Sequence, residues 1–136
     1  MSTLIILQGL PASGKSTKAR ELSQPGKNVR INRDLLREML HFGFSLKEED
    51  TVKKAEAIMI KYFLNKGYDV IVDDTNLKDK TLKWLYKMAA ECDSDVEFVK
   101  IDTPLEECIR RDAMRDHPVG KGIIKYMYDE FKLMQE

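Results

Sequence analysis

The chain alternates short apolar runs with longer segments in which apolar residues recur every three or four positions. A short continuous apolar run suits a β-strand that is buried on both faces. We place such strands at Thr3–Gln8, Asn28–Ile31, Asp69–Asp73 and Val96–Ile101. Strands that alternate with helices form βα units, which build a parallel sheet covered by helices on both faces. The pattern therefore predicts an α/β fold.

The segment between the second and third strands has the clearest helical spacing. Its apolar positions recur at three- and four-residue steps and are Val52, Ala55, Met59, Tyr62 and Phe63. Ser45 and Glu48 have the spacing of a capping box at the start of this helix. Gly67 supplies a stop, because glycine readily adopts the left-handed conformation that ends helices. We therefore expect a helix from about Leu46 to Lys66.

The other predicted helices begin near Ser16, at Asn32 or Arg33, before Leu82, at Thr103 and at Gly122. Thr103 is expected to cap its helix, because Pro104 and Glu106 follow at positions that those residues favour in a first turn. This helix is expected to end near Met114, and the last helix at Gln135. An apolar stripe predicts that the last helix packs back on the sheet.

The loop after the first strand carries the most informative motif. Residues Gly9–Ser16, with the sequence GLPASGKS, match G-x-x-x-x-G-K-[ST] between a strand and a helix. The glycines let backbone N–H groups curl around a phosphate, and the helix start adds its positive dipole end. Lys15 offers a charge to the β/γ oxygens and Ser16 a hydroxyl to Mg²⁺. The expected nucleotide contacts are Gly9, Ala12, Ser13, Gly14, Lys15, Ser16 and Thr17.

Charged residues follow the other strands, at the edge where α/β sheets bind their ligands. They are Asp34 and Arg37 after the second strand, Asp73 and Asp74 after the third, and Arg110, Arg111 and Arg115 beyond the fourth. Acidic residues after an apolar strand are typical of a Walker-B-like metal site. Each cluster also has an ordinary alternative: a surface ion pair, capping of the following helix, and helix-surface charge, respectively. Together with the phosphate-binding loop, the clusters favour a catalytic site.

Composition and length limit the classes of protein that fit this sequence. The 136 residues suggest one domain spanning residues 1–136. The 23 basic and 23 acidic residues leave no net charge, so the chain lacks the overall basicity of proteins that grip long nucleic acids. Cys92 and Cys108 have no metal-ligand spacing and are expected to be reduced thiols. The first apolar run is too short for a secretory or membrane segment, so we expect a cytoplasmic protein and no membrane partner.

Four motifs in order resemble the kinase domain of bacteriophage polynucleotide 5′-hydroxyl kinase: GLPASGKST, INRD-x-x-R, DTNL and R-x-x-x-R. The resemblance spans nearly the whole chain, and no D-x-D-x-T motif of the phage enzyme's phosphatase domain is present. It implies a three-layer P-loop kinase fold with a central parallel sheet of about four strands flanked by helices. It is also compatible with a phage-encoded protein in a host cell.

The resemblance implies transfer of the γ-phosphoryl group of ATP to the 5′-hydroxyl end of DNA or RNA, held by few local contacts. By similarity, Asp34 is the general base, Arg37 clamps an acceptor phosphate, and Arg115 bridges donor phosphates as a lid arginine. Lys15 and Arg111 would contact ATP. Ser16 and Asp74 would serve Mg²⁺, with Asp73 as the alternative to Asp74. ATP is preferred to GTP as donor because a properly placed N-K-x-D motif is missing.

Two other functions remain open from the residues. One is a small-molecule P-loop kinase, in which Arg37 would hold an anionic metabolite or nucleoside. The other is a nucleotide-dependent binding switch, in which Asp34 would have no catalytic role. The stretch from His117 to Gly122 is expected to form part of a lid over ATP or, alternatively, a plain turn between helices.

Overall fold

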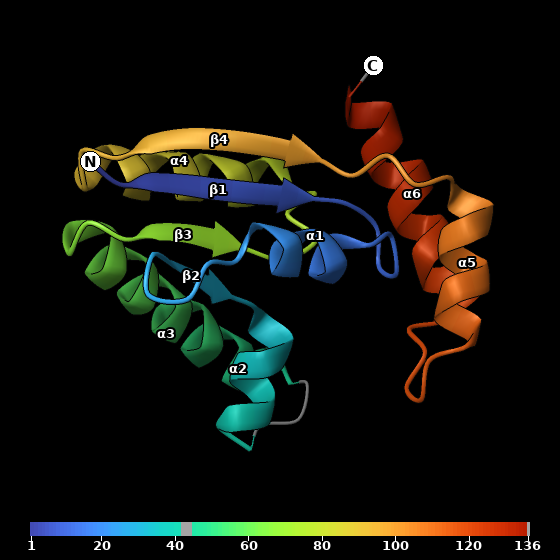
Figure 1. Cartoon of the computed structure of the whole chain (residues 1–136). Helices are drawn as coiled ribbons and strands as arrows, with labels where there is room; N and C mark the ends of the chain where they lie inside the picture. Colours follow the sequence, from blue (N-terminus) through green and yellow to red (C-terminus); the bar gives the residue numbers. More distant parts are fainter. Residues whose placement is uncertain (42–44, 136) are drawn as a thin grey trace.

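In the computed structural model, which describes residues 1–41 and 45–135, a four-stranded parallel sheet forms the centre of the molecule (Figure 1). The strands are β1 (Thr3–Gln8), β2 (Asn28–Ile31), β3 (Asp69–Val72) and β4 (Asp95–Lys100), in the order β2-β3-β1-β4. The helices are α1 (Lys15–Leu22), α2 (Arg33–Met39), α3 (Leu46–Asn65), α4 (Asp79–Glu91), α5 (Leu105–Ala113) and α6 (Lys121–Gln135). The predicted α/β fold is confirmed.

Apolar side chains of the two central strands, β1 and β3, are buried on both faces of the sheet. Leu4 and Val70 point to the face covered by α3 and α4, whereas Ile5 and Ile71 point to the face covered by α1. Adjacent residues of β1 and β3 thus serve opposite layers, because successive side chains in a strand point to opposite faces. This explains why these strands are almost continuously apolar.

Local signals set most helix ends as expected. The Ser45 hydroxyl accepts the backbone N–H of Glu48 at 3.2 Å, and Gly67 has φ of 91° just after α3. Thr103, however, does not cap α5: Pro104 stands at the N-cap, and the Thr103 hydroxyl instead donates to the carbonyl of Ser13 at 2.5 Å. The predicted cap is therefore wrong, because this hydroxyl joins the phosphate-binding loop.

The two C-terminal helices lie beyond the carboxyl ends of the strands (Figure 1). The last helix was expected to pack on the sheet, but α6 packs mainly against α5. Its Ile124 is nevertheless fully buried. Both cysteines are free thiols, as predicted. Within residues 1–41 and 45–135, no helix has the length and apolar character that crossing a membrane would require.

Candidate active site

All four strands are parallel, so the loops after them meet at one edge of the sheet, around a cavity of about 800 Å³. The predicted residues that line this cavity are Ala12, Gly14, Lys15, Ser16, Thr17, Asp34, Arg37, Asp73, Asp74, Arg111 and Arg115. Arg110 is not among them, and Gly9 and Ser13 lie in the loop without lining the cavity. Three separate clusters in the sequence thus converge on the phosphate-binding loop.

The phosphate-binding loop has the backbone that its glycines predict. Gly14 has φ of 107°, a backbone conformation that residues with a Cβ atom rarely adopt, and it is the N-cap of α1. A Cβ atom at Gly9 would lie 2.5 Å from the Ser13 hydroxyl, so a larger residue there would require Ser13 to shift. The Ser13 hydroxyl is buried and accepts no hydrogen bond from the described residues, nor does it donate one to them. The loop therefore encloses a polar concavity at a helix N-terminus, where anions bind.

Lys15 is only 9% exposed at the floor of the cavity. Its ammonium donates to the carbonyls of Gly9 at 2.9 Å and Leu10 at 2.7 Å. Burial lowers the pKa of Lys15 to about 8, against the attraction of the nearby Asp73 carboxylate, which raises it. The ammonium is thus poorly solvated and is held by neutral carbonyls, so an incoming phosphate would gain a strong charge partner.

Asp34 projects into the cavity from the first turn of α2, and its side chain is 86% exposed. Asn32 caps this helix by accepting the N–H of Leu35 at 3.0 Å. Arg37 donates to Asp34, as the ordinary alternative predicted, and its Nε also donates to Glu49 at 2.9 Å while its Nη2 reaches the other Glu49 oxygen. The base candidate therefore lies beside a guanidinium that α3 holds in place.

Glu49 was not identified as a site residue from the sequence. It lies in the acidic first turn of α3, where its charge is explained by the helix dipole alone. The hydrogen bond from Arg37 lowers the pKa of Glu49, so this carboxyl stays ionised. Arg37 thus lies between two carboxylates instead of facing an open anion site.

Asp73 and Asp74 differ sharply in their surroundings. Asp73 is 1% exposed, and its Oδ2 accepts both Nε and Nη2 of Arg30, at 2.9 and 2.7 Å. Asp74 instead accepts the backbone N–H of Arg33 through Oδ1 at 2.9 Å, and its Oδ2 has no hydrogen-bond donor in the part of the chain described. Neither residue caps α4, whose N-cap is Lys78. Asp74 thus binds the first N–H group of α2, and its Oδ2 lies 3.7 Å from Arg33 Nε.

Behind Asp74 lies a buried charged cluster that joins α2, α3 and α4. Arg33 Nε donates to the fully buried Glu56 at 3.0 Å, and the Arg33 guanidinium lies 5.9 Å from the centre of the Trp84 ring. Burial raises the pKa of Glu56 well above its usual range, and the adjacent Asp74 carboxyl adds to the rise. A proton on Glu56 would let it donate to Asp74, which accounts for two buried oxygens that otherwise have no donor.

Helix α5 brings arginines to the opposite wall of the cavity. Arg111 donates to the Ser13 carbonyl at 3.4 Å and to Glu107 at 2.9 Å. Arg110 also pairs with Glu107, on the helix surface, and the two guanidinium groups lower the pKa of Glu107 to about 2. Arg115 follows one turn after Arg111 and lines the cavity. All three arginines thus pair with nearby carboxylates, but only Arg111 and Arg115 line the cavity.

The site fits a magnesium ion that is bound partly by phosphate. Among residues 1–41 and 45–135, no group of three or more His, Cys, Asp or Glu side chains could hold a metal by itself. Ser16 and Asp74 both line the cavity, so a hydroxyl and a carboxylate are available to a metal there. Magnesium binds through one or two such oxygens together with substrate phosphates and waters.

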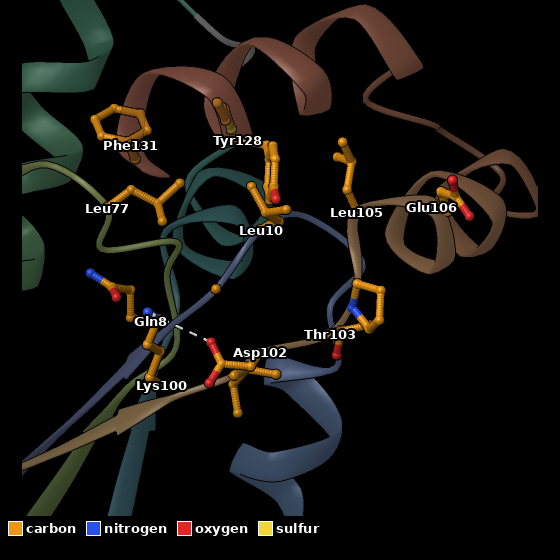
Figure 2. Close-up of a pocket in the computed structure, with 14 residues that line it drawn as sticks. Gln8, Leu10, Leu77, Lys100, Asp102, Thr103, Leu105, Glu106, Tyr128 and Phe131 are labelled. Atoms are coloured by element: carbon orange, nitrogen blue, oxygen red, sulfur yellow. Dashed lines mark ion pairs between the residues drawn. The ribbon is translucent and has the colours of Figure 1, made fainter. Parts of the chain in front are cut away.

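Figure 2 shows a second cavity, of about 610 Å³. Met127 lines both cavities. Its lining includes Leu10, Leu77, Leu105, Tyr128 and Phe131, which are labelled in Figure 2. Its ion pair, Lys100–Asp102 at 3.7 Å, joins two exposed side chains at the end of β4. Because the charged groups of the phosphate-binding loop face the first cavity, that cavity is the candidate active site.

Comparison with known proteins agrees with this arrangement. A family model described as an AAA domain matches residues 4–134. An L-seryl-tRNA(Sec) kinase from Methanococcus maripaludis is 32% identical over 133 residues, covering 94% of this chain and 52% of the relative. A chain in the Pnkp1/Rnl/Hen1 RNA repair complex is 29% identical, with a TM-score of 0.85 over 98% of this chain and 45% of the other.

A more distant structure, the APS kinase CysC from Mycobacterium tuberculosis, is 20% identical with a TM-score of 0.67 and shares the fold. The present chain spans about half the length of the seryl-tRNA kinase and of the RNA repair protein. The family model, by contrast, covers almost the entire chain. The chain therefore belongs to this AAA-domain family and has the fold of the kinases that it resembles.

Proposed function

We propose that this protein is a kinase that transfers the γ-phosphoryl group of ATP to the 5′-hydroxyl end of a nucleic acid. One observation carries the proposal: Asp34 and Lys15, from separate strands' loops, line the same cavity. The similarity to a chain of an RNA repair complex supports a nucleic-acid acceptor. Because the chain has no net charge, we expect the acceptor end to be held by few local contacts.

The proposed reaction needs one bond to form and one to break. The acceptor oxygen bonds to the γ-phosphorus, the bond from that phosphorus to the bridging oxygen breaks, and ADP leaves. Asp34 takes the proton of the hydroxyl late in this step, when the forming bond has made it acidic. A weakly basic carboxylate suffices under those conditions.

The cationic residues act on the charge of the transferred group. Lys15 contacts the β- and γ-phosphates, and the backbone N–H groups of the loop hold the β-phosphate. Arg111 of α5 and Arg115, just beyond the end of that helix, stabilise charge on the equatorial oxygens. Ser16 and Asp74 would hold Mg²⁺, which would supply positive charge for the transferred group.

Arg37 has a double task in this proposal. A guanidinium with a planar fork of donors can hold Glu49 with Nε and Nη2 and still present Nη1 elsewhere. In the structure Nη1 meets Asp34. We infer that an acceptor phosphate competes with Asp34 for this donor, which would release the carboxylate toward the hydroxyl.

A second acceptor deserves a direct comparison because the seryl-tRNA kinase is 32% identical. Its name points to a seryl hydroxyl on tRNA as the group phosphorylated in that protein. The exposed Asp34 side of the cavity would serve such a primary alcohol with the same chemistry. The two acceptors differ in the group beside the alcohol, which is a nucleotide in one case and an aminoacyl ester in the other.

We expect 5′-hydroxyl oligonucleotides to be phosphorylated at least about tenfold more efficiently, by kcat/KM, than seryl-tRNA, nucleosides or sugars. The measurement is transfer of labelled γ-phosphate from ATP to each acceptor, with 5′-phosphorylated oligonucleotides as the matched blank. Preferential labelling of seryl-tRNA would replace the acceptor in our proposal. ATP binding without transfer to any of these acceptors would favour a binding switch.

Nucleotide affinity should weaken as the pH rises above about 8. Burial lowers the pKa of Lys15 to about 8, so the free protein loses this cation above that pH. Bound phosphate favours the charged form, so binding between pH 8 and the usual lysine pKa takes up a proton. Titration calorimetry of ADP in metal-free buffers of different ionisation enthalpy measures this uptake. Lys15→Met should abolish the pH dependence, and an affinity that stays constant to pH 9.5 would refute this explanation.

A further inference from the structure

Asp112 is a buried carboxylate that the proposed reaction does not use. Its side chain is 2% exposed, although it lies near the exposed C-terminal end of α5. Its Oδ1 accepts the backbone N–H of Val119 at 3.0 Å, and its Oδ2 accepts that of Gly120 at 2.9 Å. Burial alone would raise the pKa of Asp112, but these bonds and Arg115 hold it below its usual value. The carboxylate is therefore the anchor of the loop between α5 and α6.

The same carboxylate also reaches a residue of the active site. Arg115 Nη1 lies 3.5 Å from Asp112 Oδ1. Arg115 and Val119 both line the cavity of about 800 Å³. Gly120 has φ of 108°, so the chain turns there in a conformation that other residues disfavour. This turn presents two consecutive N–H groups to one carboxylate. Asp112 thus links the position of Arg115 to the position of the loop.

We propose that Asp112 is a positioning residue for the phosphoryl transfer: it fixes the α5–α6 loop and holds the Arg115 guanidinium at the cavity. This inference rests on the proposed role of Arg115. Arg115 is 47% exposed, so without a fixed partner its long side chain would sample many rotamers. A partner that also anchors the backbone reduces the entropy lost when the guanidinium meets the phosphates.

Two acceptor oxygens are required at this position. Asparagine has nearly the same shape, but it offers one acceptor oxygen and places an N–H group against one of the two backbone donors. Asp112→Asn therefore breaks one loop hydrogen bond and removes the charge beside Arg115. Asp116→Asn, in the exposed loop itself, removes an equal charge and serves as the matched control.

The test is a double-mutant cycle on steady-state kinetics. Asp112→Asn should lower kcat at least about tenfold, with a smaller change in the KM for the acceptor, while Asp116→Asn stays within about twofold of the unmodified protein. In an Arg115→Ala background the same Asp112→Asn change should cost less than about twofold. Equal costs in both backgrounds would overturn the proposal, because a purely structural residue acts independently of Arg115.

Hydrogen exchange gives a readout that needs no acceptor. The amides of Val119 and Gly120 should be protected in the unmodified protein and should exchange at least about tenfold faster in Asp112→Asn. If the variant does not fold, protection of these two amides in the unmodified protein still supports the anchor, and rapid exchange overturns it. Failure to phosphorylate any acceptor would refute the proposed function and leave this result in place.

Discussion

Asp34→Asn should retain ATP affinity and lower turnover at least about a hundredfold, on the scale usual for a lost general base. The amide keeps the shape of the carboxylate but does not take the proton of the attacking hydroxyl. Asp34 is exposed and its one ion-pair partner among the described residues, Arg37, remains held by Glu49, so the fold should be unaffected. A hundredfold loss corresponds to about 2.7 kcal/mol of transition-state stabilisation.

Glu38→Gln is the matched control for this variant. Glu38 lies on the same short helix, is exposed, and does not line the cavity. It should leave turnover within about twofold of the unmodified protein. Turnover is measured by labelled phosphate transfer at saturating ATP, and affinity by calorimetry. Near-normal turnover of Asp34→Asn would contradict Asp34 as the base for any acceptor hydroxyl.

The positions of the strands were predictable because the sequence signals that define them are local. The bounds of β1 and β2 match the prediction to the residue, and those of β3 and β4 differ by one residue. The apolar runs of β1 and β3 suit strands buried on both faces, whereas β4 alternates apolar and polar residues and is largely exposed. Parallel pairing then places the loops at one edge. The convergence of Lys15, Asp34 and Arg115 on one cavity follows from this topology.

The partners of the charged residues were not predictable in this way. Arg30 binds Asp73 across 43 residues, and Arg37 binds Glu49 from another helix. The first pair depends on how β2 and β3 align, and the second on how α2 packs against α3. The charges of these residues also have sufficient local explanations in a helix or on a surface. Thr103 shows the same limit, because its local pattern predicts a cap whereas tertiary contact assigns its hydroxyl to Ser13.

Glu56 has the largest expected effect on stability among these unpredicted partners. It is fully buried, and its carboxyl group accepts a hydrogen bond from Arg33 Nε at 3.0 Å. Arg33 starts α2 and directly precedes Asp34, while its N–H is fixed by Asp74. The cluster therefore joins the base candidate to the metal candidate. Loosening Arg33 should move both groups relative to the phosphate-binding loop.

Glu56→Ala should destabilise the fold by about 3 kcal/mol or more, because a buried charged hydrogen bond is lost and a cavity remains. Glu56→Gln should cost less than about 1 kcal/mol, since its amide still accepts from Arg33 and donates to Asp74 as the protonated carboxyl would. Urea unfolding of both variants measures the difference. Asp50→Ala, which removes an exposed ion pair with Lys54 on the same helix, should cost at most about 1 kcal/mol. Equal losses for the alanine and glutamine variants would show that Glu56 acts as a charge and not as a hydrogen-bonding bridge.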